Sequence, residues 1–145
     1  MKIASKFLAV GLILTAGGAF AQATATDPDA LARQLLMDAN SKAIVALSNM
    51  VITERPFDAA SAAAAKAALI AYAAAIPVKF KANTTDPASR AKPEIWANWD
   101  DFSAKAAALG TAATALDTTS LESIKASLNA VGGTCAACHT AYRTK

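Results

Sequence analysis

The sequence has few of the side chains that catalysis and metal binding use most. Its 145 residues include one histidine and two cysteines. A second histidine for acid–base chemistry is therefore missing, and we do not expect an enzyme. No segment alternates polar and apolar residues with the period of two that a strand shows. No basic run or basic–aromatic cluster is present, which argues against nucleic-acid binding.

Long apolar runs are also scarce, and the one at the N-terminus is short. Two lysines precede an apolar segment over residues 7–16, and a small–x–small sequence follows at 19–21. This order is typical of a secretory signal peptide over residues 1–21, with cleavage after residue 23 as the alternative. A membrane anchor is disfavoured because a spanning helix needs about 20 apolar residues.

Removal of this signal leaves a mature single domain over residues 24–145 and changes the charge balance. Loss of Lys2 and Lys6 reduces the 14 basic residues to 12, against 11 acidic ones. A nearly neutral chain gives no electrostatic reason to bind nucleic acid. No other segment is apolar enough to cross a bilayer, and the bacterial type of signal predicts a periplasmic protein with no membrane span after cleavage.

The mature sequence is rich in alanine, which has the highest helix propensity, and its larger apolar residues recur at spacings of three and four. Asp27 and Asp58 are the predicted N-caps of the first two helices, and Pro77 is predicted to end the second. Thr119 and Glu122 form a predicted capping box for the last helix. The four helices cover about 28–53, 59–76, 93–116 and 120–145. This pattern predicts an all-α fold, an antiparallel four-helix bundle.

All cysteine and histidine side chains of the chain lie within five residues near the C-terminus. The segment "CAACH", residues 135–139, has the C-x-x-C-H spacing of a c-type haem attachment site. Positions i, i+3 and i+4 share one helix face. Cys135 and Cys138 can therefore form thioethers to one covalent haem c, while His139 reaches the iron from the same side. The haem is expected near the C-terminal helix.

Other uses of these residues stay open from the motif alone. A disulfide between Cys135 and Cys138 suits an oxidising compartment but would be strained within a helix and leaves His139 unexplained. A thioredoxin-like pair belongs beside a strand, and a structural zinc site needs a fourth ligand, which a carboxylate would have to supply. A haem-free structural bundle or metal-binding module is the broadest alternative. Haem attachment explains all three residues together.

Further short motifs accompany the haem motif along the mature chain. They are "RQLLM" at 33–37, "RPFD" at 55–58, "KPEIW" at 92–96 and "VGG" at 131–133, followed by "CAACHTAYR". In this order they resemble the class II cytochromes c, the group that contains cytochrome c′ and its low-spin, Met/His-ligated relatives. Most small c-type cytochromes carry the haem motif near the mature N-terminus, whereas here it lies on the last predicted helix.

The resemblance implies roles for individual side chains. His139 would be the proximal iron ligand, and Arg143 would be the basic residue that flanks it. The family's distal position lies four residues after a basic residue of the first helix, which places it at Met37, after Arg33. Met37 is therefore the candidate sixth ligand, and core packing is its alternative role. Arg33 would lie near the haem edge and pair with a propionate.

The resemblance also implies a function. A Met/His-ligated haem favours electron transfer, so we expect a periplasmic electron-transfer cytochrome with periplasmic or membrane redox partners. If Met37 only crowds the distal face, the alternative is a five-coordinate, cytochrome c′-type protein that binds NO or CO. The family often dimerises through its first two helices, and the alanine-rich second helix is compatible with a homodimer.

Overall fold

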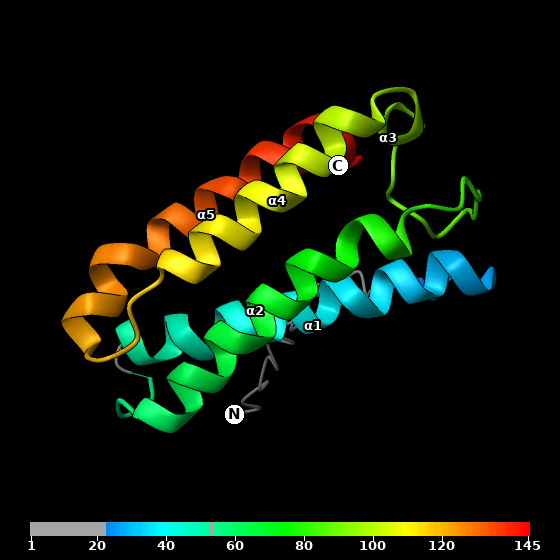
Figure 1. Ribbon diagram of the computed structural model, residues 1–145. Coiled ribbons are helices and arrows are strands. Elements are labelled where there is room, and N and C mark those ends of the chain that lie inside the picture. The colour runs from blue at the N-terminus through cyan, green and yellow to red at the C-terminus, as the bar shows by residue number, and fades with distance from the viewer. Residues whose placement is uncertain (1–22, 53) are drawn as a thin grey trace, which may run out of the picture.

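The computed structural model describes residues 23–52 and 54–145, and the signal peptide expected at 1–21 lies outside them. Its helices are α1 Pro28–Val51, α2 Ala59–Lys79, α3 Glu94–Ala97, α4 Trp99–Ala115 and α5 Leu121–Tyr142. The four long helices run alternately up and down, with α1 and α2 in one layer and α4 and α5 in the other (Figure 1). The predicted antiparallel four-helix bundle is confirmed.

The first two helices begin at the predicted caps. Asp27 Oδ1 accepts a hydrogen bond from Ala30 N at 2.8 Å, and Asp58 Oδ1 accepts one from Ser61 N at 2.6 Å. Each bond satisfies a backbone N–H that the start of a helix leaves without an intrahelical partner. Pro28 occupies the first position of α1, where its missing N–H costs nothing.

The second helix does not end at Pro77, and that prediction is wrong. α2 continues to Lys79, and Phe80 N donates to Ile76 O at 3.0 Å to close the last turn. Proline lacks only its own N–H, so the N–H groups that follow it can still form helical hydrogen bonds. Because Ile76 and Phe80 are both buried, their packing holds the final turn in helical form despite the proline.

The helix predicted over 93–116 is two helices, α3 and α4, which are separated at Asn98. The backbone of Asn98 has φ −126° and ψ 49°, which is not helical. Its Nδ2 donates to Glu94 O at 3.0 Å, and asparagine side chains compete with backbone donors in this way. The break leaves Ile95 on the short α3 fully buried.

The last helix begins one residue later than predicted. Ser120 is the N-cap, and its Oγ accepts from Ser123 N at 3.1 Å. Thr119 instead donates from its N and Oγ1 to Asp117 Oδ1, at 2.9 and 2.7 Å. Hydrogen bonds to a carboxylate are strong. Asp117 therefore holds Thr119 in the turn before α5, and Thr119 does not cap the helix.

The α2–α4 interface is built from small side chains. Ala62, Ala65 and Ala73 on α2 are buried. A Cβ placed on Gly110 of α4 would lie 3.6 Å from the Cβ of Ala73. The two helices therefore approach closely at this point, and an open groove of about 680 Å³ lies beside the contact.

The apolar character of α2 also qualifies one expectation from the sequence. By length and composition α2 is a candidate membrane span, with a mean hydropathy of 1.6 over its most apolar window. The expectation that no mature segment reaches this level is wrong, because alanine raises hydropathy while adding little side-chain area. Leu69 and Ile76 on its inner face are buried within the bundle core.

Candidate haem-binding site

A pocket of about 520 Å³ lies between α1 and α5. Of the neighbouring pairs of long helices, α1 and α5 make the fewest contacts, so the bundle is open on this side. All the predicted site residues line the pocket: Arg33 and Met37 from α1, Cys135, Cys138 and His139 from α5, and Arg143 just after α5. The volume lies within the range of small-molecule and cofactor sites.

The haem motif is helical, and its three side chains share one face of α5. Cys135 and Cys138 are free thiols and are half-buried. Burial raises the pKa of both thiols. The separate sulfur atoms weaken the disulfide interpretation. Among residues 23–52 and 54–145, no group of three or more His, Cys, Asp and Glu side chains could hold a metal ion.

The imidazole of His139 lies in a positive environment. Partial burial lowers its pKa, and the nearby Arg143 and Arg90 guanidinium groups lower it further. Both effects favour the neutral ring, because burial and the two neighbouring cations disfavour a positive charge on it. A neutral imidazole has a nitrogen lone pair and can bind a metal ion. The lowered pKa of His139 therefore favours the form that an iron ligand needs.

Arg33 is buried, with 3% of its surface exposed, and is not an ordinary surface arginine. Its guanidinium lies 5.3 Å from the ring centre of Trp96 and 5.5 Å from that of Phe80. Nη2 donates to Thr84 Oγ1 at 2.6 Å and to Thr84 O at 3.0 Å. Nε and Nη1 are buried and have no hydrogen-bond partner among the described residues. Such donors fit an anionic group in the pocket.

The loop between α2 and α3 is joined to the chain end just after α5. Arg90 O accepts from Thr144 N at 2.9 Å, and Arg90 Nη2 donates to Thr144 O at 3.0 Å. Ala91 and Arg143, the next residues inward, form an antiparallel bridge beside these bonds. We refer to residues 90–92 and 142–144 together as the terminal clasp. It holds the end of α5 close to the residues of the haem motif.

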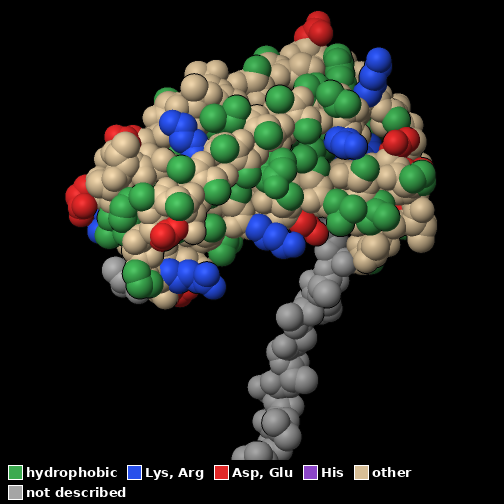
Figure 2. Space-filling model, turned by 60° about the horizontal axis from the view of Figure 1, so that its bottom comes forward, with side chains coloured by type: hydrophobic (Ala, Val, Ile, Leu, Met, Phe, Trp, Pro, Cys, Tyr) green, Lys and Arg blue, Asp and Glu red, His purple; other side chains and the backbone are tan. Residues whose placement is uncertain are grey.

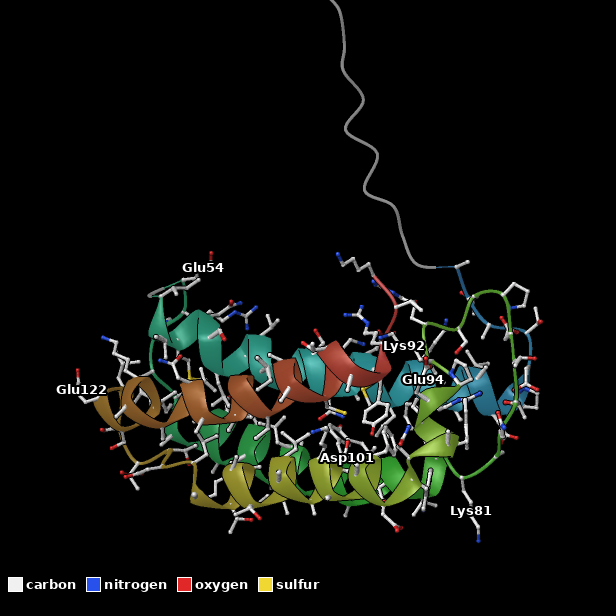
Figure 3. The ribbon with its side chains drawn as sticks, turned by 90° about the horizontal axis from the view of Figure 1, so that it is seen from above. Glu54, Lys81, Lys92, Glu94, Asp101 and Glu122 are labelled. Carbon is white, nitrogen blue, oxygen red and sulfur yellow. The ribbon has the colours of Figure 1, made fainter. Side chains whose placement is uncertain are left out.

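Aromatic side chains form the wall between α4 and the end of α5. Tyr142 packs edge-on against Phe102, with ring centres 5.4 Å apart, and Trp99 lies 5.6 Å from Phe102. Tyr142 Oη donates to Asp101 Oδ2 at 2.5 Å, and this bond raises the pKa of Tyr142 to about 12. Asp101 lies between α4 and α5 in Figure 3. The bond and the ring contacts fix α5 against α4.

The structure thus brings together every predicted site residue, but sequence reasoning missed several neighbours. Thr84 and Phe80, which hold Arg33, lie on a loop and at a helix end. Arg90 and Lys92 of the terminal clasp had no assigned role, although Lys92 begins the "KPEIW" motif. That motif was the one available signal. The path of the loop across the bundle decides these contacts, and no local pattern reports it.

Comparison with protein families matches residues 29–143 to the family described as Cytochrome C′. The chain belongs to the cytochrome c′ family. The match extends from the first turn of α1 to the residue after α5, so it includes the whole bundle and the haem motif. Membership of this family makes the protein a haem protein of the electron-transfer or gas-binding kind.

Two relatives are named cytochrome c-556. The one from Agrobacterium fabrum is 40% identical over 95 residues, which are 63% of this chain and 64% of the relative. The one from Agrobacterium tumefaciens strain apple 185 is 38% identical over 117 residues, covering 79% of this chain and 93% of the relative. The chain therefore spans less than two thirds of the first relative and nearly all of the second.

Solved structures share the bundle. Cytochrome c′ from Rhodobacter sphaeroides is 30% identical, with a TM-score of 0.73, covering 81% of this chain and 95% of that one. A nitric oxide complex of a cytochrome c′ mutant from Alcaligenes xylosoxidans is 28% identical, with a TM-score of 0.71, covering 81% and 94%. A cytochrome c′ with ligand-controlled dimer dissociation is 25% identical, with a TM-score of 0.70, covering 81% and 95%.

The family and the residues agree on the cofactor. Homologues bind haem c covalently, and Cys135 and Cys138 fit the attachment motif, so the cofactor is covalent haem c. The described residues also fit the group physically. They supply two free thiols, a neutral imidazole and a pocket with a largely apolar lining, together with the unpaired N–H donors of Arg33 for an anionic substituent.

Proposed function

We propose that this protein is a periplasmic electron-transfer cytochrome in which His139 and Met37 would hold the haem iron. The supporting observation is that Met37 on α1 and His139 on α5 line the same pocket. Bound haem c supplies a one-electron redox couple, and Met/His axial ligation raises its reduction potential. Ligation by both residues would leave no open iron position and would favour electron transfer over the binding of an external ligand.

The remaining site residues would anchor and neutralise the group. Cys135 and Cys138 hold it to α5, so its position follows that helix. Arg33 offers Nε and Nη1 to a propionate, and this would relieve the cost of leaving two buried donors unpaired. Partial burial, together with Arg143 and Arg90, lowers the pKa of His139 and so favours its neutral form. The sequence has no second histidine, and we propose no enzymatic reaction.

The optical spectrum of wild type and of Met37→Ala tests the ligation. We expect a low-spin spectrum with a methionine–ferric iron charge-transfer band in wild type, and a high-spin spectrum without that band in Met37→Ala. Met50→Ala is the matched control, since Met50 lies on the same helix and is buried in the core. It should lower stability and leave the spin state unchanged. A high-spin wild-type spectrum would overturn the ligation by Met37.

The second candidate function is gas binding at a five-coordinate iron. It is supported by the nitric oxide complex of the Alcaligenes xylosoxidans relative, which shares this bundle. In this case Met37, which is half-buried, would fill space beside the distal face without binding the iron. Rapid CO binding by the reduced wild-type protein would favour this function. Slow CO binding that becomes fast in Met37→Ala would favour ligation.

Export and assembly belong to the same proposal. The signal over residues 1–21 would deliver the chain to the periplasm, where periplasmic or membrane redox partners would meet it.

Val45 and Ile52 on the α1 side and Val78 on α2 are exposed, and hydrophobic and charged side chains intermingle on that side of the molecule (Figure 2). We propose a homodimer through α1 and α2. Val45→Glu should shift a dimer to monomer in sedimentation equilibrium, and a monomeric wild type would refute it.

A further inference from the structure

One residue outside α5 binds most of the carbonyls at its C-terminal end. The last four carbonyls of a helix have no partner within it. Lys92 N donates to Tyr142 O at 3.0 Å. Lys92 Nζ donates to Ala141 O at 3.1 Å and to Thr140 O at 3.4 Å. Lys92 therefore satisfies three of these four carbonyls, with its backbone and its side chain together.

The fourth carbonyl belongs to the haem motif itself. His139 O accepts from Arg143 N at 3.0 Å, which closes the last turn of the helix. The terminal clasp positions Lys92 to bind these carbonyls, because the bridge between Ala91 and Arg143 aligns residues 90–92 with the end of α5. Pro93 follows Lys92 and restricts its backbone to extended conformations. Lys92 lies beside the C-terminal end of α5 (Figure 3).

We propose that Lys92 is a positioning residue of the haem site: it caps the helix that carries the haem and raises the reduction potential of the bound group. This inference rests on the proposed binding of iron by His139. It adds to that proposal a residue from a distant loop that touches neither the thiols nor the imidazole.

The reason is both mechanical and electrostatic. Without Lys92 Nζ, the carbonyls of Thr140 and Ala141 would turn to water and the last turn would fray, so His139 would be held less firmly. The carbonyl end of a helix also carries a partial negative charge. That charge would stabilise the ferric form, and the Lys92 ammonium offsets it. Removal of the ammonium therefore lowers the reduction potential.

The experiment compares holoprotein variants by local hydrogen exchange and by redox titration. Lys92→Met keeps the backbone N–H and the aliphatic chain but removes the ammonium, whereas Lys92→Arg keeps a cation with several donors. Lys145→Met is the charge control, because it removes one exposed positive charge at the same end of the chain. Amides of α2 serve as the internal reference for global unfolding.

In Lys92→Met we expect the amides of Arg143 and Thr144 to exchange about tenfold faster, with α2 unchanged, since hydrogen bonds from a charged donor contribute at least this factor to local opening. The reduction potential should fall. In Lys92→Arg, the exchange rates and the reduction potential should both stay close to the wild-type values. The proposal is overturned if either the exchange rate or the reduction potential does not change, if exchange rises uniformly, or if Lys145→Met lowers the potential equally.

The two proposals fail separately. The exchange measurement reports the end of α5 whether or not Met37 binds the iron. A high-spin wild-type spectrum would therefore remove Met37 as a ligand without affecting the result for Lys92. Conversely, an unchanged potential in Lys92→Met would remove the role of Lys92 without affecting the Met37→Ala spectrum.

Discussion

The two sides of the bundle are held together by different means. On the α2–α4 side, small side chains bring the backbones close, and a Cβ at Gly110 would meet the Cβ of Ala73 at 3.6 Å. On the α1–α5 side a pocket of about 520 Å³ separates the helices. This side depends on polar connections through loops, such as Thr84 to Arg33 and Lys92 to the end of α5.

The difference shows how a small bundle makes room for a cofactor. A helix pair that is held apart loses contact area, and dispersion and burial energy fall with it. Connections from the loop between α2 and α3 replace part of that contact without filling the space between the helices. We call the α2–α4 side the packed side and the α1–α5 side the open side. The stability of the packed side should respond to changes of side-chain volume, and that of the open side to changes of charge and pH.

The largest effect is expected from a cavity on the packed side. Leu69 on α2 is fully buried, so Leu69→Ala should lower the free energy of unfolding by about 2–5 kcal/mol. Denaturant unfolding of the holoprotein measures this loss. Val78→Ala is the control on the same helix, since Val78 is 70% exposed and its change should stay within about 0.5 kcal/mol. Equal losses in both variants would refute the contrast.

A smaller effect, which changes sign, is expected at Gly110. Gly110→Ala places a methyl group at ordinary contact distance from Ala73 and should stabilise the helix by about 0.4–1 kcal/mol. Gly110→Leu overfills the same contact and should destabilise by about 1–3 kcal/mol. Thermal unfolding of the three proteins measures both changes. Stabilisation by leucine would show that the packed side has room to spare.

The smallest effect is expected at acid pH, in the contribution of Asp86 to the unfolding free energy. Asp86 accepts hydrogen bonds from Thr26, Asp27 and Ala88, and these lower its pKa from 3.8 to about 2. Its folded pKa is depressed, so its contribution to stability is present above pH 3.8 and is lost as the pH falls towards 2. Asp86→Asn should flatten the fall in unfolding free energy between pH 4 and 2.

The packed side provides the control for that pH experiment. Leu69→Ala should lower the unfolding free energy by the same amount at every pH between 4 and 2, because a buried leucine binds no proton. If Asp86→Asn shifts the plot of unfolding free energy against pH by the same amount at every pH, then the charge of Asp86 does not stabilise the open side.

Much of the fold and of the site was predictable because the signals are local. Alanine content and apolar spacing predict helices, and Asp27 and Asp58 mark two starts by side chains that act within three residues. Cys135, Cys138 and His139 are neighbours in sequence, so one helix places them together. The resemblance to a known family added Met37, which no local rule distinguishes from a core methionine.

The errors and omissions share a different cause. Pro77 stays helical because Ile76 and Phe80 are buried by partners far along the chain. The burial of Arg33 depends on a loop that returns across α1 with Thr84. Lys92 acts through carbonyls on another helix. Each outcome depends on tertiary contacts, which override local propensity and leave no periodic pattern in the sequence.

The terminal clasp also has a consequence for the order of assembly. Arg90 and Thr144 are 54 positions apart in the chain, and closing so long a loop costs entropy that only the intervening helices can offset. We therefore expect α4 and α5 to pair first and the clasp to close afterwards, because contacts of high sequence separation form late. In pulse-labelling during refolding, the amide of Thr144 would gain protection after those of α4. The haem side of the molecule would then be the last part to close.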